Sequence, residues 1–235
     1  MYSGGKMNDS IFEVNRNFEL LVTDIGNYKN KLISIKNFLK YPESFREFLL
    51  SIPTQETIKE GKSPRGFYPG VQLYLTYNFE MMEDCLRFLM WEHYGYKVDY
   101  FNFSFQYIDG NKKVYKQSNN PHCDQKSIAG NLFLNYKDEI DGETGTAFYR
   151  LKETGEECFF PNSCMYRKHR YGFTSPDLRL DNFAPPKEDD RYEMYHLSPV
   201  EFNTLNLYEG SLFHNSFIEA NTFKKHKRMT FSFTG

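Results

Sequence analysis

A chain of 235 residues suits a single domain, because barrels and sandwiches often reach this length as one unit, and it can bury a sizeable core. The formal net charge of −2 argues against general nucleic-acid binding, which needs a surplus or stripe of basic residues. Aromatic residues make up 18% of the chain, which favours β structure and a pocket with aromatic walls.

Cysteine use and hydrophobic patterning predict a cytoplasmic protein. The first residues carry no apolar segment of the kind found in signal peptides. No run approaches the ~18 apolar residues that a membrane span needs. Cysteines are sparse and form no C-x-x-C pair, which is typical of reduced thiols; they are Cys85, Cys123, Cys158 and Cys164.

The N-terminal part, about residues 1–98, is predicted to be mainly helical, with short strands near its start. Residues 31–36 alternate between polar and apolar side chains, as in a strand. Apolar residues then recur at helical spacing from Pro42 to Ile52, and again from Phe79 to His93, with Gly95 near the end. Each stripe is explained by packing on a sheet, so we expect the N-terminal helices to cover one sheet of a β-rich core.

After Gly95 the apolar period becomes two, which predicts strands through most of the remaining chain. Strands are expected at residues 101–107, 146–149, 203–208, 211–218 and 228–233. Residues 151–200 look irregular and are rich in Tyr, Arg, Asp and Pro, which is typical of a lid-like insert. We therefore predict one α+β domain over residues 1–235, with a mainly β core at about 99–235. That core is expected to be a jelly roll, the cupin-like double-stranded β-helix.

Two histidines and a carboxylate form a candidate metal site. His122 and Asp124 are two positions apart, so on an extended segment both side chains point to the same face, and Cys123 points away. His214 follows far downstream in a predicted strand. Two histidines and one carboxylate on one face of a metal are typical of non-haem Fe(II) oxygenases. The alternatives are a turn capped by Asp124 and a core histidine at position 214 bonded to the backbone.

The last predicted strand adds a candidate anion-binding group. Its alternation places three apolar side chains on one face and Arg228, Thr230 and Ser232 on the other. A guanidinium with a hydroxyl two residues on suits a carboxylate, because the planar fork bonds two oxygens at once. The alternative is an edge strand whose polar face meets solvent.

The order of these motifs resembles the Fe(II)- and 2-oxoglutarate-dependent oxygenases. In particular, it is similar to the prolyl-4-hydroxylase-like branch, including poorly characterised bacterial and phage relatives. The likeness is strongest over about 100–150 and 203–235, and it is absent over 151–200. It is carried by His122-x-Asp124, the strand Leu132–Asn135, the run Gly145–Phe148, His214, and Arg228-x-Thr230.

The resemblance implies roles for these residues. His122, Asp124 and His214 correspond to the catalytic iron ligands, and Arg228 with Thr230 corresponds to the site for the far carboxylate of 2-oxoglutarate. Phe133 stands where some members carry a cosubstrate-binding tyrosine, so that role is expected to pass to one of two others, Tyr107 or Tyr115. The basic residues near Arg228 that offer an alternative to it are Lys224, Lys225 and Lys227.

The resemblance also implies a reaction. Fe(II) is the expected cofactor, and 2-oxoglutarate and O2 are the expected cosubstrates, with release of succinate and CO2. Asp124 favours hydroxylation, because a small residue replaces this carboxylate in the halogenating members.

The expected substrate is an amino acid, a peptidyl side chain or a small natural product, and a nucleic acid is disfavoured. Candidate substrate-facing residues are Tyr166, Arg170, Tyr171, Arg179 and Arg191. The competing hypothesis is a non-catalytic jelly-roll module, either a cupin-like or lectin-like binding domain or a viral structural protein.

Overall fold

The described residues form two antiparallel sheets with helices on one side. The computed structural model describes residues 9–52, 71–109, 121–124, 126, 128–158, 191–219, 222 and 227–235. The seven-stranded sheet has the order β1 (Glu19–Ile25), β2 (Asn30–Lys36), β8 (Thr204–Glu209), β5 (Ile128–Phe133), β10 (Lys227–Thr234), β4 (Asn102–Asp109), β3 (Val71–Leu75). The three-stranded sheet has the order β7 (Tyr192–Pro199), β6 (Thr144–Leu151), β9 (His214–Ile218). Short 3-10 turns lie at Asp9–Phe12 and Lys137–Glu139.

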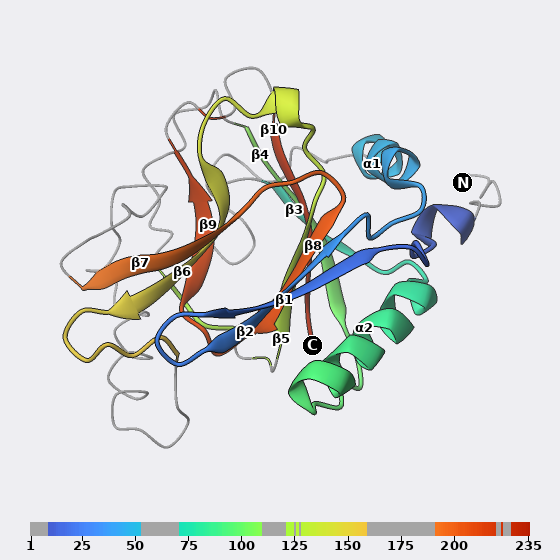
Figure 1. Cartoon of the computed structure of the whole chain (residues 1–235). Coiled ribbons are helices and arrows are strands. Elements are labelled where there is room, and N and C mark those ends of the chain that lie inside the picture. Colours follow the sequence, from blue (N-terminus) through green and yellow to red (C-terminus); the bar gives the residue numbers. More distant parts are fainter. Residues whose placement is uncertain are drawn as a thin grey trace.

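Helices α1 (Pro42–Ser51) and α2 (Glu80–Tyr94) lie on the face of the large sheet that points away from the small sheet (Figure 1). Pro42 starts α1, where its missing N–H costs nothing. Gly95 ends α2 with φ 71°, a left-handed conformation that glycine adopts without strain. These boundaries agree with the helices predicted from the apolar spacing.

The main core fills the space between the helices and the large sheet. The ring of Phe45 on α1 meets Phe231 of β10 edge-on at 5.1 Å, and Phe79, just before α2, meets Phe103 of β4 at 4.6 Å. Alternate residues of each strand enter this core, including Leu132, Leu205, Leu207, Met229, Phe231 and Phe233. The residues between them therefore face the small sheet.

The interior between the sheets is lined by polar side chains. The amide of Asn131 on β5 donates to the hydroxyl of Thr146 on β6 over 3.2 Å. The amide of Asn206 on β8 donates to the hydroxyl of Ser198 on β7 over 2.7 Å. These bonds satisfy buried polar groups across the interior, so this face of the large sheet is more polar than the helix-side core.

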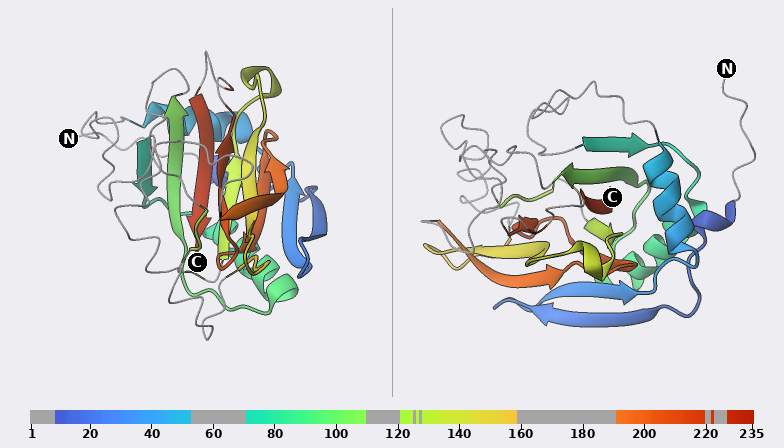
Figure 2. Two further views of the ribbon diagram at one scale, coloured as in Figure 1. Left: turned by 90° about the vertical axis from the view of Figure 1, so that its left-hand side faces the viewer. Right: turned by 90° about the horizontal axis from the view of Figure 1, so that it is seen from above.

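Two sequence predictions need correction. The N-terminal part is not chiefly helical, because it supplies β1 and β2 at one edge of the large sheet and β3 at the other (Figure 2, right). The segment 151–200 is not irregular throughout, because Tyr192–Pro199 is the strand β7. Its alternation is hard to read because the pairing with β6 is shifted at Phe148/Tyr149 and most of its side chains are only half-buried.

Part of the predicted lid lies outside the described residues, including Tyr166, Arg170, Tyr171 and Arg179. Arg191 is described and sits at the start of β7, with its guanidinium 5.9 Å from the ring centre of Tyr192. No helix in the described parts of the chain is long and apolar enough to cross a membrane.

Candidate metal centre

The segment that carries His122 and Asp124 is bound to the edge of the small sheet. The backbone N–H of His122 donates to the carbonyl of His214 over 3.0 Å, and the N–H of His214 donates back over 2.9 Å. Two residues on, the N–H of Asp124 donates to the carbonyl of Gly210 over 2.8 Å. This pairing brings two motifs that lie far apart in the sequence onto neighbouring backbones.

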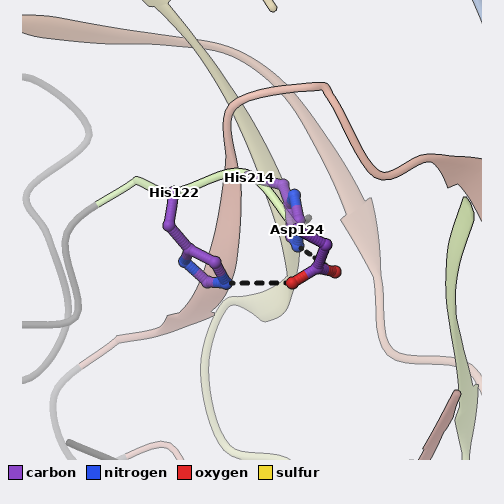
Figure 3. A group of neighbouring side chains, drawn as sticks. All are labelled: His122, Asp124 and His214. Atoms are coloured by element: carbon purple, nitrogen blue, oxygen red, sulfur yellow. Dashed lines mark ion pairs between the residues drawn. The ribbon is translucent and has the colours of Figure 1, made fainter. Parts of the chain in front are cut away.

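The three predicted ligand side chains converge (Figure 3). Nε2 of His214 lies 3.5 Å from one carboxylate oxygen of Asp124, and Nε2 of His122 lies 4.0 Å from the other. All three ligand atoms lie within 4.8 Å of one another. Two imidazole nitrogens and one carboxylate oxygen form a donor set that suits Fe(II), and it leaves further coordination positions open.

The tautomer of His214 suits metal binding. Its Nδ1 lies 2.9 Å from the carbonyl oxygen of Leu212, which can only accept, so Nδ1 carries the proton. Nε2 then presents its lone pair to the site, an arrangement common among metal-bound histidines. His214 is therefore both a buried histidine bonded to the backbone and a potential ligand, so the two predicted readings coexist.

Asp124 is held in its ionised form. Burial alone would raise the pKa of its carboxyl, but when the two imidazoles are protonated, a hydrogen bond from His214 and the charges of His214 and His122 outweigh that effect and lower the pKa. The side chain of His122 is 45% exposed, so the site opens on that side. Cys123 turns away, as predicted, and its thiol donates to the carbonyl of Ser211 over 2.9 Å.

Arg228 lies in the interior, at 1% exposure. Strand β10 is flanked by β5 and β4, so it is not an edge strand. The guanidinium carbon lies 5.7 Å from the ring centre of Phe133, on the face that points to the small sheet. Thr230 is equally buried on the same face, and its hydroxyl has no hydrogen-bond partner among the described residues.

Other predicted cosubstrate residues lie elsewhere. Tyr107 of β4 pairs with Met229 and packs against the helix-side core, on the opposite face of the sheet from Arg228. Lys227 is exposed, with its ammonium 4.6 Å from the ring centre of Tyr107, so it too faces away from Arg228. Tyr115, Lys224 and Lys225 lie outside the described residues.

Sequence reasoning missed Tyr208 of β8. Its ring meets that of His214 edge-on at 4.8 Å, and burial raises the pKa of its hydroxyl. The charge of Asp124 raises this pKa further, whereas the hydrogen bond from Asn131 and the charge of Arg228 lower it. The alternation of Leu205 and Leu207 with the residues beside them was the signal that could have placed Tyr208 in the interior.

Comparison with known proteins gives a family match over most of the chain and distant likenesses to solved structures. A family model described as a family of unknown function (DUF6445) matches residues 16–230. No curated protein matches the chain. Among solved structures, the crystal structure of a Pseudomonas putida prolyl-4-hydroxylase is similar, with 11% sequence identity and a TM-score of 0.38 over 82% of this chain and 80% of that one.

Proposed function

The chain belongs to the DUF6445 family, whose function is unknown, and from the geometry of its site we propose that it is an Fe(II)- and 2-oxoglutarate-dependent oxygenase. The observation that carries the proposal is that the metal-binding triad and a buried arginine share one interior. The ring of Tyr208 meets that of His214 at 4.8 Å, and its hydroxyl accepts from Asn131 of β5 over 3.1 Å. Phe133, on the same face of β5 as Asn131, lies 5.7 Å from the guanidinium carbon of Arg228, so the triad and the arginine line one interior. A metal chelator with a distant carboxylate fits this pair of features, and 2-oxoglutarate is such a molecule.

The order of the strands supports a double-stranded β-helix as the fold. From β4 onward, counting the segment at His122 that pairs with β9, the chain alternates between the sheets except at β6 and β7, which are neighbours in the small sheet. Strands β8, β5, β10 and β4 are adjacent in the large sheet, facing β7, β6, β9 and the segment at His122. This is the arrangement expected of a jelly roll.

Each side chain has a defined task in this proposal. His122, Asp124 and His214 hold Fe(II) and leave positions for 2-oxoglutarate and O2. Arg228 pairs with the far carboxylate, and the hydroxyl of Thr230 donates to it. The bound iron with its cosubstrates supplies the oxidising power to hydroxylate an unactivated C–H bond, with release of succinate and CO2. The buried interior keeps water from the reacting groups.

We infer hydroxylation in particular because Asp124 occupies a coordination position. An amino acid, a peptidyl side chain or a small natural product is the proposed substrate class. The half-exposed side of the site at His122 is the direction from which such a substrate would approach.

Anaerobic addition of Fe(II) and then 2-oxoglutarate tests the proposal. We expect a visible metal-to-ligand charge-transfer band and, on admission of O2, the formation of succinate. His214→Ala should reduce metal affinity by more than about 100-fold, since loss of an outer-shell partner alone costs about 10- to 100-fold. Arg228→Met should leave metal binding intact and weaken 2-oxoglutarate binding by about 10- to 100-fold.

Cys123→Ala is the matched control, because Cys123 lies between the two proposed ligands but points away from them. This variant should bind metal and 2-oxoglutarate as the parent does. A parent protein that binds metal but shows no band with 2-oxoglutarate would support the alternative, a non-catalytic jelly-roll binding module. A band that survives His214→Ala would refute the assigned ligand set.

A further inference from the structure

Glu157 is a fully buried carboxylate outside the proposed metal centre. It belongs to a short segment, residues 156–158, that follows β6, and its side chain is 0% exposed. A buried carboxylate is costly unless donors surround it. The donors around Glu157 therefore indicate what this segment is held against.

These donors come from the turn between β1 and β2 and from the first residue of β2. One carboxylate oxygen accepts the N–H of Asn27 over 2.7 Å and lies 3.7 Å from the guanidinium of Arg150. The other accepts the N–H of Tyr28 over 3.4 Å and the side-chain amide of Asn30 over 3.0 Å. Figure 1 shows this turn beside the chain that leaves β6. The turn is thus closed by a carboxylate 130 positions further along the chain.

The turn is shaped to fit the carboxylate. Gly26 has φ 71°, a left-handed conformation that suits glycine. A Cβ atom at Gly26 would overlap the carboxylate of Glu157. Both the conformation and the close approach require glycine, so the turn and the carboxylate form one packed unit.

The backbone of the same segment holds the residues just before His214. The N–H of Phe213 donates to the carbonyl of Glu157 over 2.9 Å, and Cys158 pairs with Leu212. The carbonyl of Leu212 in turn lies 2.9 Å from Nδ1 of His214 and accepts its proton. Glu157 is therefore connected, through short backbone contacts, to the group that sets the tautomer of a proposed metal ligand.

A turn can be closed by its own side chains, as Asn and Asp commonly do. Here the acceptor comes instead from the segment that borders Leu212 and Phe213. We propose that Glu157 is a positioning residue for His214. Its carboxylate ties the turn between β1 and β2 to this segment and so keeps the carbonyl of Leu212 against Nδ1. This inference rests on the metal site of the function proposed above and adds a residue that touches neither the metal nor its cosubstrates.

Glu157→Gln tests the inference, because it keeps the shape of the side chain but replaces one acceptor oxygen with a donor. Anaerobic titration should show Fe(II) affinity lower by about tenfold or more, as found when the supporting groups of metal ligands are removed. The metal-free protein gives a second readout, the proton NMR signal of the Nδ1–H of His214, identified by its loss in His214→Ala. This signal should broaden and exchange faster with water in Glu157→Gln.

Glu139→Gln is the matched control. Glu139 is also a buried carboxylate paired with an arginine, but that arginine is Arg46 of α1. Its substitution should lower the urea midpoint and change neither Fe(II) affinity nor the His214 signal. The same pattern in Glu157→Gln would show that Glu157 is merely structural.

Gly26→Ala perturbs the contact from the side of the turn, and it decides the question if Glu157→Gln does not fold. The added methyl group displaces the carboxylate of Glu157, so Fe(II) affinity and the His214 signal should change as in Glu157→Gln. Gly95→Ala is its control, because Gly95 also has φ 71° but nothing within 4 Å of the added carbon. It should lower the urea midpoint alone.

The outcomes separate this inference from the proposed function. If folded Glu157→Gln and Gly26→Ala bind Fe(II) as the parent does and keep the His214 signal, the inference is overturned while the proposed function stands. If the parent binds no Fe(II), the proposed function fails. An unchanged His214 signal in the metal-free variants would then overturn the positioning role separately.

Discussion

At the scale of single residues, the metal centre depends on how closely two backbones approach. The carbonyl of Gly210 accepts the N–H of Asp124, and Gly210 also lies close to the backbone at Lys126. A Cβ atom at Gly210 would lie 2.3 Å from the carbonyl oxygen of Lys126 and 3.2 Å from Cβ of Asp124. The first contact is with backbone, which cannot rotate away, so the absence of a side chain here keeps Asp124 beside His214.

Gly210→Ala should therefore weaken metal binding without removing any ligand. We expect the segment at Asp124 to move and Fe(II) affinity to fall about 10- to 100-fold, the range found when a metal's supporting groups are disturbed. Calorimetric titration with Fe(II) under anaerobic conditions measures this. Gly155→Ala is the comparison, because Gly155 has φ 72° with nothing within 4 Å of the added carbon. Gly155→Ala should lower the free energy of unfolding through backbone strain and leave Fe(II) affinity unchanged. If the two variants bind Fe(II) equally well, Gly210 does not hold Asp124 in place for the metal.

At the scale of elements, the buried Asn135 fixes the start of β10, and so the place from which Arg228 projects. Its side-chain oxygen accepts the N–H of Met229 over 2.7 Å, and its amide donates to the carbonyl of Lys227 over 2.8 Å. These two backbone groups flank Arg228. The same amide donates to Glu139 over 3.1 Å, and Glu139 in turn pairs with Arg46 of α1. A helix on one side of the sheet is thus linked to the arginine position on the other.

Asn135→Ala should destabilise the fold by about 2–4 kcal/mol, since buried backbone groups at Lys227 and Met229 lose their partners. The affinity for 2-oxoglutarate should fall as well, because the start of β10 is no longer held. Urea unfolding gives the first quantity and the charge-transfer titration the second. Asn17→Ala, at an exposed turn, should change stability by no more than about 0.5 kcal/mol. An unchanged free energy of unfolding in Asn135→Ala would show that the two hydrogen bonds from Asn135 to the start of β10 do not stabilise the fold.

At the scale of the whole molecule, Fe(II) and 2-oxoglutarate bound as proposed would contact both sheets. The three proposed metal ligands lie on the small sheet and its adjoining segment, whereas Arg228 and Tyr208 belong to the large sheet. A molecule that binds both the metal and Arg228 therefore adds contacts across the interior that the free protein lacks. Stability should accordingly depend on both ligands together.

Fe(II) with 2-oxoglutarate at about 100 times its dissociation constant should add about 2.7 kcal/mol to the free energy of unfolding. For a chain of this size, that corresponds to a rise of about 5–10 °C in the melting temperature. Differential scanning calorimetry without O2 provides the measurement. 2-Oxoglutarate without metal, or both ligands added to His214→Ala, should give little change. A similar rise in melting temperature in those two controls would show that the ligands bind outside the proposed metal centre.

Much of the local structure was predictable from sequence. Both helices follow from apolar residues at helical spacing, and β4 and β10 follow from strict alternation. Alternation also placed Arg228 and Thr230 on the polar face of their strand. The three metal ligands predicted from the sequence, in the motif His122-x-Asp124 and at His214, are the side chains that converge in the structure. β7 escaped prediction because its shifted pairing and half-buried faces blur the period of two.

By itself, the sequence determined the candidate metal ligands, which converge in the structure, and the strand face that Arg228 and Thr230 occupy. The tertiary structure alone decided which strands are neighbours. It paired His122 with His214, buried Arg228 in the middle of the sheet, sent Tyr107 to the helix side and brought Tyr208 to the pocket. The physical reason is that periodicity records contacts between residues a few positions apart. Strand pairing depends on contacts between distant segments, which form only when the whole chain closes around its core.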